Sequence, residues 1–247
     1  MVVDGRRVLV TGASSGLGAH MAASLAARGA RVAAAARRLE ALEALAAGAE
    51  GRILPVAMDV SDPGSVLRGV TEAARALGGL DGLVNNAGVA WSGHALEMPE
   101  DAWQRVIDTN LSGVFRVAQA AARLMAEGGG GAVVNIASIL GIGTGLGLAA
   151  YATSKAAVAH LTRSLALEWA RHGIRVNALA PGYFPTEMNR DYLESAEGEK
   201  LKRRIPMARF GRLEDLDGPL ELLLGESGAY ITGAVLPVDG GHLLRSL

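Results

Sequence analysis

Tyr151 and Lys155 are the two residues of this sequence whose types and spacing most clearly suggest chemistry. They stand four positions apart in an alanine-rich stretch, so both side chains should lie on one helix face, one turn apart. An ammonium group beside a phenol favours the ionised phenol, so we expect the pKa of Tyr151 to fall below its usual value of about 10. A tyrosine tuned in this way can act as a general acid or base. The alternative is a solvated helical pair without a chemical role.

Two further features favour a chemical role for this stretch. Ser138 follows the apolar run 132–137, which indicates a buried strand, and ligands bind at the carboxyl ends of strands in open α/β sheets. Lys155 is one of only three lysines, against 21 arginines. Because the chain otherwise supplies positive charge with arginine, a lysine at this position suggests that a compact ammonium group is needed.

A glycine-rich turn near the N-terminus predicts an anion-binding site. It spans residues 11–18, between an apolar strand at 7–10 and a helix expected from about Gly16 to Ala30. Glycines let the backbone approach a phosphate, and the unpaired N–H groups at a helix N-terminus favour negative charge. A tight strand-to-helix turn without a ligand is the alternative.

The second expected strand, 31–36, ends in Arg37 and Arg38. Dinucleotide folds that bind NAD place an acid at this strand end, whereas an arginine accommodates the 2′-phosphate of NADP. Ala36 stands at the acid position, so the sequence favours NADP(H) over NAD(H). The alternative is that both arginines point into solvent.

Composition excludes several classes of protein and site. The formal net charge of −1 gives no basic field for nucleic acid or anionic lipid, and the absence of cysteine excludes disulfides and thiolate chemistry. The five histidines show no metal-ligand spacing and none is adjacent to the proposed site, so we expect no metal. The first residues run directly into a strand without room for a signal peptide, and no apolar run reaches the roughly 18 residues of a membrane span. We therefore expect a cytoplasmic protein.

The order of elements along the chain predicts a single α/β domain with a parallel sheet, because strands alternate with helical stretches. The expected later strands lie at 53–58, 82–84, 132–137, 174–179 and 234–238. Ser61 is the expected N-cap of the helix after the third strand. A helical run from about Asp101 to Met125 is interrupted near Asn110, where the helix should bend or face a polar group. The polar segment 183–210 is too long for an ordinary connection and is expected to be a substrate lid.

With these motifs placed, the sequence resembles the short-chain dehydrogenase/reductase family over essentially its whole length. The resemblance rests on the ordered motifs Thr11-Gly12-x3-Gly16-x-Gly18, Asp59, Asn85-Asn86-Ala87-Gly88, Asn110, Ser138, Tyr151-x3-Lys155, Pro181-Gly182 and Thr186. It implies a Rossmann-type doubly wound parallel sheet of about seven strands, with residues 1–247 as one dinucleotide-binding catalytic domain. It also implies a catalytic set of Asn110, Ser138, Tyr151 and Lys155, in which Asn110 holds a water for proton relay.

The resemblance also implies a nucleotide site. Its cofactor-binding residues would be Gly12, Ser14, Ser15, Gly16, Leu17, Gly18, Arg37, Arg38, Asp59, Val60, Asn86, Ala87, Gly88, Tyr151, Lys155, Pro181, Gly182, Phe184 and Thr186. Many NADP-dependent relatives carry a basic residue where this chain has Ser15, so Arg37 and Arg38 would have to select NADP(H) alone.

The expected activity is hydride transfer between a nicotinamide and a ketone or secondary alcohol. The expected substrate is uncharged and largely apolar, or a 3-oxoacyl thioester, in contact with Leu140, Leu148, Tyr183, Met188 and Tyr192. A sugar-alcohol dehydrogenase is the second possibility for the substrate. A non-catalytic dinucleotide-binding or regulatory protein, or another chemistry on the same fold such as epimerisation, is the alternative for function.

Two helices that are apolar on more than one face, around Asn110–Met125 and Tyr151–His172, predict self-association. Apolar residues of the helix after Tyr151 are Val158, Leu161, Leu165, Leu167 and Trp169, more than one sheet contact needs. The family resemblance implies pairing of such helices across a two-fold axis, with the Asp239–Gly241 end in a second interface, giving a homotetramer.

Overall fold

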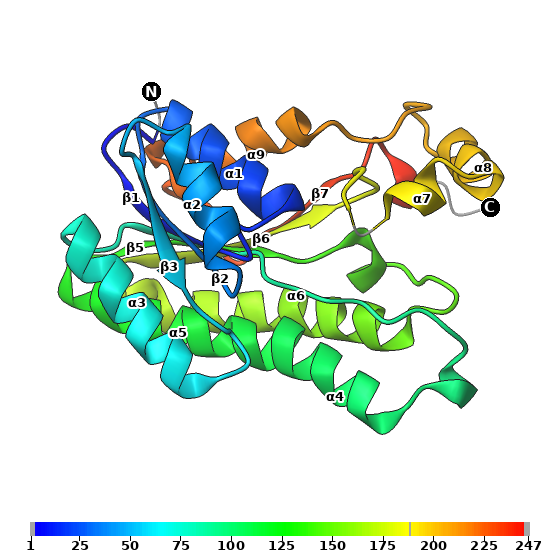
Figure 1. Cartoon of the computed structure of the whole chain (residues 1–247), viewed down its shortest axis with the longest axis horizontal. Coiled ribbons are helices and arrows are strands. Elements are labelled where there is room, and N and C mark those ends of the chain that lie inside the picture. The colour runs from blue at the N-terminus through cyan, green and yellow to red at the C-terminus, as the bar shows by residue number, and fades with distance from the viewer. Residues whose placement is uncertain (1–2, 188, 245–247) are drawn as a thin grey trace.

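The computed structural model describes residues 3–187 and 189–244, which form one α/β domain around a seven-stranded sheet (Figure 1). The strands are β1 (Arg7–Thr11), β2 (Arg31–Ala36), β3 (Ile53–Ala57), β4 (Gly82–Asn85), β5 (Gly131–Ile136), β6 (Ile174–Pro181) and β7 (Val235–Val238). Their order is β3-β2-β1-β4-β5-β6-β7, and every neighbouring pair is parallel. The predicted fold class, a doubly wound parallel sheet, is therefore confirmed.

Helices cover both faces of this sheet, as Figure 1 shows. One face carries α1 (Gly16–Ala27), α2 (Leu39–Ala47) and α9 (Asp217–Leu224). The other carries α3 (Pro63–Leu77), α4 (Glu100–Ile107), α5 (Gly113–Glu127) and α6 (Ala149–Trp169). The short helices α7 (Arg190–Leu193) and α8 (Ala196–Arg204) lie within the expected lid segment. The central strands are apolar without alternation because both of their faces are buried, as in β2, where residues 32–35 are fully buried.

Two boundaries differ from expectation. The first helix ends at Ala27, before Gly29, whose φ of +93° ends a helix readily. Asp62, rather than Ser61, caps α3: its carboxylate accepts a hydrogen bond of 2.9 Å from the Gly64 N–H. The Ser61 hydroxyl instead donates to Asp59 Oδ1 at 2.6 Å, so the serine is occupied by the preceding turn.

The expected interruption near Asn110 is confirmed as a π-helical turn, Asp108–Ser112, between α4 and α5. Asn110 is fully buried there, although asparagine is a poor former of helix interiors. Its amide side chain accounts for this, because it accepts a hydrogen bond from Val89 N at 2.8 Å and donates to Val89 O at 2.9 Å. The widened turn therefore directs a polar side chain at the loop that follows β4.

The apolar face expected on α6 is narrower than its sequence indicates. Val158 and Leu165 are buried in the core, and Leu161 and Trp169 pack against it. Of the five residues, only Leu167 is exposed, with 84% of its surface accessible. The other four pack wholly or partly against the core, so of these five residues the helix exposes one, Leu167, and not a continuous apolar stripe.

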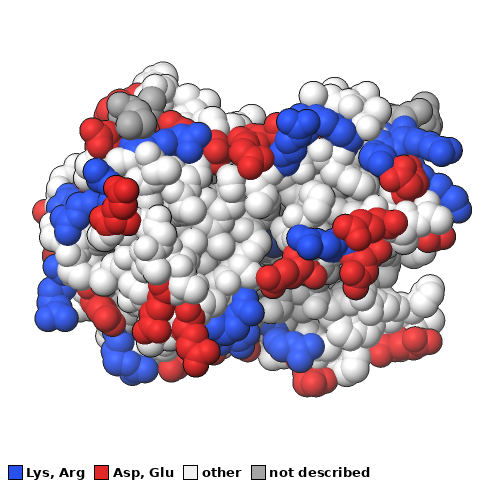
Figure 2. All heavy atoms as spheres, turned by 45° about the horizontal axis from the view of Figure 1, so that its top comes forward, with Lys and Arg blue, Asp and Glu red and all other residues white. Residues whose placement is uncertain are grey.

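The molecular surface has mixed charge. On the face in Figure 2, basic and acidic side chains are interspersed and neither sign dominates, in keeping with the net charge of −1. Within the part of the chain that the structure describes, no helix is both long enough and apolar enough to cross a bilayer.

Candidate active site

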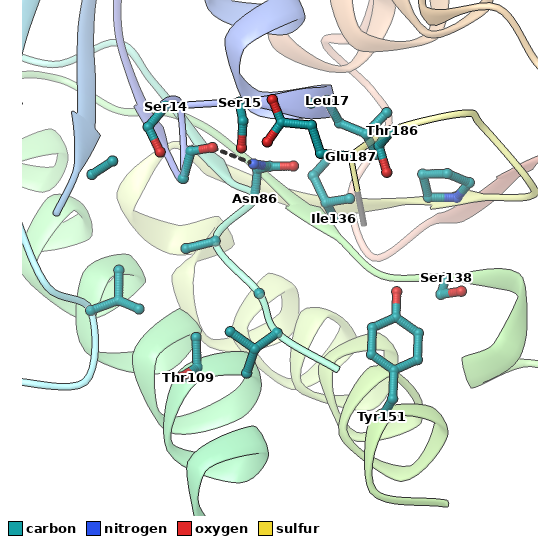
Figure 3. A pocket seen from close by; sticks show the side chains of 18 of the residues that line it. Ser14, Ser15, Leu17, Asn86, Thr109, Ile136, Ser138, Tyr151, Thr186 and Glu187 are labelled. Carbon is teal, nitrogen blue, oxygen red and sulfur yellow. Dashed lines mark hydrogen bonds between the residues drawn. The ribbon is translucent and has the colours of Figure 1, made fainter. Parts of the chain in front are cut away.

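A cavity of about 410 Å³ opens at the carboxyl ends of the strands, where the strand order reverses between β1 and β4. Ligands of open α/β sheets bind at such a switch point. Most of the predicted catalytic and cofactor-binding residues line this one cavity: Gly12, Ser14, Ser15, Gly16, Leu17, Arg37, Arg38, Asp59, Val60, Asn86, Ala87, Gly88, Ser138, Tyr151, Lys155, Pro181, Gly182, Phe184 and Thr186. In Figure 3, Ser14, Ser15 and Asn86 lie toward one end of the cavity, and Ser138 and Tyr151 toward the other.

The glycine-rich turn is shaped by close backbone contacts. Gly12 has a φ of +65°, and a Cβ at this position would lie 2.7 Å from Ala87 Cα. A Cβ at Gly18 would collide with the Gly12 carbonyl and the Asn86 amide. Gly18 does not line the cavity, and its lack of a side chain lets the first turn of α1 pack against the glycine-rich turn, while its contact with a cofactor stays a prediction.

Thr11 and Asn86 hold this turn against the loop after β4. Thr11 Oγ1 accepts hydrogen bonds from Asn86 N at 3.0 Å and Ala87 N at 3.1 Å. The Asn86 side chain donates to the main-chain oxygens of Thr11 and Gly12 at 3.0 and 3.2 Å. The loops after β1 and β4 therefore form one rigid wall of the cavity.

The two arginines after β2 face this cavity, not bulk solvent alone. Arg38 donates to Ser15 Oγ at 3.0 Å and to Ser14 Oγ at 3.2 Å, which draws its guanidinium over the glycine-rich turn. The hydrogen bond from Ser61 lowers the pKa of Asp59, and the positive charge of Arg37 adds to this effect. A carboxylate and two guanidinium groups thus surround this end of the cavity.

Tyr151 and Lys155 share a face of α6, with Lys155 Nζ 5.7 Å from the centre of the phenol ring. The ammonium group is buried and donates to the Ile136 carbonyl oxygen at 2.7 Å, so it is not directed at the phenol oxygen. Burial lowers the pKa of Lys155 from 10.5 to about 8. The expected lowering of the Tyr151 pKa is wrong for this structure: burial raises it, and the hydrogen bond with Ser138 opposes that rise only in part.

Ser138 stands two residues beyond the end of β5, as predicted. Its hydroxyl accepts a hydrogen bond from Leu140 N at 3.1 Å and starts a 3-10 turn at Ile139–Gly141. Gly141 then lets this turn rest on α6, because a Cβ there would lie 2.6 Å from the Lys155 carbonyl carbon. Ser138 is thereby fixed relative to α6.

Asn110 is close to this group of residues but does not line the cavity. A Cβ built on Gly88 would lie 3.4 Å from Asn110 Oδ1 and 3.6 Å from Lys155 Nζ. Asn110 also donates to Ser154 Oγ at 3.0 Å, and Ser154 donates to the Tyr151 carbonyl oxygen at 2.7 Å. Asn110 therefore supports the first turn of α6, and its role in proton relay stays a prediction.

The predicted substrate contacts are not brought to the cavity. Leu140, Leu148 and Tyr192 do not line it, and Met188 lies outside the described residues. Tyr183 lines a second cavity of about 230 Å³ behind the lid. Its ring packs edge-on against His242, with centroids 5.5 Å apart.

Several cavity residues were not predicted from the sequence. They are Ala36, Met58, Val89, Thr109, Ile136, Ala137, Glu187 and Asn189. Ile136 and Ala137 could have been found, because they immediately precede Ser138 at the end of a predicted strand. Glu187 and Asn189 lie in an irregular segment, where no periodicity indicates which side chains turn inward.

Comparison with known proteins identifies the family. The model of the family described as short chain dehydrogenase matches residues 6–197. This chain belongs to that family. The dehydrogenase is 39% identical to gluconate 5-dehydrogenase of Gluconobacter oxydans over 243 residues, covering 97% of this chain and 95% of that protein. It is 37% identical to a 3-oxoacyl-acyl-carrier-protein reductase of Thermotoga maritima, covering 99% and 100% of the two chains.

A solved structure resembles this short-chain dehydrogenase throughout. The crystal structure of a gluconate 5-dehydrogenase from Burkholderia cenocepacia J2315, in complex with NADP and tartrate, superposes with a TM-score of 0.94. The two are 36% identical, and the match covers 98% of this chain and 96% of the other. The relatives are oxidoreductases, so hydride-transfer chemistry is the activity of this family.

Proposed function

We propose that this short-chain dehydrogenase transfers a hydride between NADP(H) and a ketone or secondary alcohol, with Tyr151 as general acid and base. One observation carries the proposal: Ser138, Tyr151 and Lys155 line the same cavity as the glycine-rich turn at the N-terminus of α1. A dinucleotide-binding protein without catalysis has no need of these three side chains at one end of the cavity.

The residues present fit a dinucleotide. Gly12 and Gly16 form a cradle without side chains at a helix N-terminus, which suits a diphosphate. Arg37 and Arg38 supply cations beside it, where a 2′-phosphate would lie. The Burkholderia relative crystallised with NADP supports the same preference. When bound, the cofactor supplies or accepts the hydride.

The roles of the polar side chains follow from their positions. Tyr151 would hold a proton at its phenol oxygen and give it to the carbonyl oxygen of the substrate, or remove it in the oxidation direction. The raised pKa keeps the phenol protonated at neutral pH, which suits reduction. Ser138 would donate a hydrogen bond to the same oxygen as negative charge develops. Lys155 would hold the ribose and supply positive charge beneath the phenol.

The substrate class is proposed from the relatives and from the cavity. The leucines expected to contact an apolar substrate do not line the cavity, and one relative is a gluconate 5-dehydrogenase. We therefore place a hydroxylated, sugar-derived ketone or alcohol first, and a 3-oxoacyl thioester second because of the Thermotoga relative.

Turnover by a Tyr151→Phe variant tests the proposal. The ring and its packing remain while the proton donor is lost, so turnover should fall by about 10²–10⁴-fold, with binding of NADPH nearly unchanged. The assay follows the near-ultraviolet absorbance of NADPH or NADH against a panel of sugar-derived, thioester and apolar ketones. A Phe variant with near-wild-type turnover would remove Tyr151 from this role. Cofactor binding without turnover on any member of the panel would favour the non-catalytic alternative.

We also propose that the protein is a homotetramer. The exposed Phe115 on α5 and Leu167 on α6 support the helical interface, although the apolar face is narrower than its sequence indicates. The family resemblance supports the second interface at Asp239–Gly241.

A further inference from the structure

The carboxylate of Glu187 is a feature of the cavity that hydride transfer does not explain. Glu187 lies on the lid segment and lines the cavity together with Ser15, Gly16 and Leu17. Figure 3 shows its carboxylate pointing toward Ser15 and Leu17, not away from the cavity. Among the residues that the structure describes, it makes no hydrogen bond or ion pair. An unpaired acid thus faces the place where the backbone is shaped for phosphate.

The helix end that Glu187 faces has no negative partner of its own. The side chain of Ser15, the N-cap of α1, makes no capping hydrogen bond to that helix and instead accepts from Arg38, and the first turn of α1 contains no acidic residue. The partial positive charge of the helix N-terminus is therefore unbalanced within α1. A carboxylate on another segment is attracted to such a position, and so is a phosphate.

The lid backbone holds Glu187 at this place. The Asn189 side chain accepts a hydrogen bond from Thr186 N at 2.8 Å and donates to the Phe184 carbonyl oxygen at 3.0 Å. Asn189 N donates in turn to Thr186 O at 3.1 Å, which closes a turn around Glu187. The Thr186 side chain packs against α1, because a Cβ on Gly16 would lie 3.5 Å from it. The turn that carries Glu187 therefore rests on the N-terminus of α1.

We infer that Glu187 is a determinant of cofactor affinity: its carboxylate stands in for the cofactor diphosphate at the N-terminus of α1 and must be displaced when the dinucleotide binds. This inference rests on the proposed cofactor. Both anions are attracted to the same helix dipole, and they repel each other at short range. Binding of the dinucleotide is weaker as a result. The Glu187 carboxylate provides a counter-charge to the helix N-terminus when no cofactor is bound, and it competes with the cofactor after the reaction.

A Glu187→Gln variant tests this by direct binding. The amide keeps the size of the side chain and removes its charge, so the Kd values of NADPH and NADH should both fall, by about two- to fivefold. Because the affected group is the diphosphate that both dinucleotides share, the ratio of the two Kd values should not change. Adenosine 2′-monophosphate, which has no diphosphate, should bind both proteins equally. Calorimetry or nicotinamide fluorescence without substrate provides the measurement.

Two control variants make the result specific to the position of the charge. Glu194→Gln removes a lid carboxylate that does not line the cavity, so the Kd should remain that of the wild type. Glu187→Asp keeps the charge and should show less tightening than Glu187→Gln. An unchanged or raised Kd for Glu187→Gln would overturn the inference, and so would equal tightening in Glu194→Gln or for adenosine 2′-monophosphate.

The test separates this inference from the proposed function. Tighter dinucleotide binding in a protein that reduces no ketone would support the role of Glu187 and contradict the catalytic proposal. Turnover that depends on Tyr151, with affinity independent of Glu187, would do the reverse. Failure of the wild type and every variant to bind either dinucleotide would overturn both.

Discussion

Lys155 is buried, yet its amine has one hydrogen-bond acceptor, the Ile136 carbonyl oxygen, in place of a carboxylate. Desolvation of an ammonium group without a counter-ion lowers its pKa, here to about 8. The phenol of Tyr151 keeps its proton to higher pH because burial disfavours the phenolate. In the protein without ligand, the lysine therefore loses its proton before the tyrosine does. The sequence alone suggests that Tyr151 loses its proton first. The four-residue spacing shows that the two side chains are close, but it does not show where the amine of Lys155 points.

The buried lysine should make stability depend on pH. Its pKa is about 8 in the folded state and about 10.5 when unfolded, so the unfolded chain binds more protons between these values. The penalty for burying the charge is fully present below about pH 8 and disappears above about 10.5. The free energy of unfolding of the wild type, relative to Lys155→Met, should therefore rise by up to about 3 kcal/mol across this window.

Urea titrations at pH 7, 8, 9 and 10 would measure this difference. Lys200→Met, which removes an exposed lysine, controls for loss of a lysine as such. If the free energy of unfolding of the wild type, relative to Lys155→Met, stays constant or falls as pH rises, burial of the charged amine is contradicted.

At the scale of elements, the π-helical turn between α4 and α5 connects the loop after β4 to α6. Asn110 binds both main-chain groups of Val89, and through Ser154 it reaches the Tyr151 carbonyl oxygen. Three segments distant in the sequence thus meet at one amide side chain. The arrangement fixes where α6 begins, and therefore where the phenol points.

Asn110→Ala should destabilise the protein by about 1–3 kcal/mol, because it leaves partly buried main-chain groups of Val89 without partners. Ser112→Ala lies in the same π-helical turn and removes a hydroxyl that makes no side-chain cap hydrogen bond, so it should have little effect. The shift in the urea midpoint gives the comparison. An equal loss of stability in the two variants would mean that the hydrogen bonds of Asn110 to Val89 are not the cause of the destabilisation.

Most elements of the fold and the nucleotide side of the site were predictable, because they depend on local patterns. Buried parallel strands appear as apolar runs, and the glycines of residues 11–18 mark a turn with close backbone contacts. The substrate side was not predictable. Leu140 and Tyr192 are in single short turns, the 3-10 turn Ile139–Gly141 and α7, where no periodicity along the sequence indicates the direction of a side chain. Glu187 was missed for the same reason, and Asp62 was missed because Ser61 has the same capping chemistry one residue earlier.

At the scale of the whole molecule, the proposed association of copies of the chain depends on a small number of exposed apolar residues. The exposed apolar residues on α5 and α6 are few, so the proposed helical interface would depend on Phe115 and Leu167 more than on a long stripe. An interface with few apolar anchors is sensitive to each of them.

Light scattering should return about four times the 25.4 kDa mass of one chain. Phe115→Glu should lower that mass, because an unpaired charge would be buried at the centre of the helical interface. Leu67→Glu, on the exposed side of α3, should leave the mass unchanged. A monomeric wild type, or equal dissociation in both variants, would contradict the tetramer.

The contact of Gly141 with the backbone of α6 has a consequence for how new specificities could arise. It anchors the chain directly after Ser138, and the chain is held again at Gly147, whose carbonyl oxygen accepts from Gly93 N at 3.0 Å, whereas Leu146 between these two points is almost wholly exposed. Residues 142–146 should therefore tolerate exchange, lengthening or randomisation as a cassette while Ser138 and Tyr151 stay in register. Laboratory evolution toward a chosen alcohol should begin in that window and leave the glycine untouched.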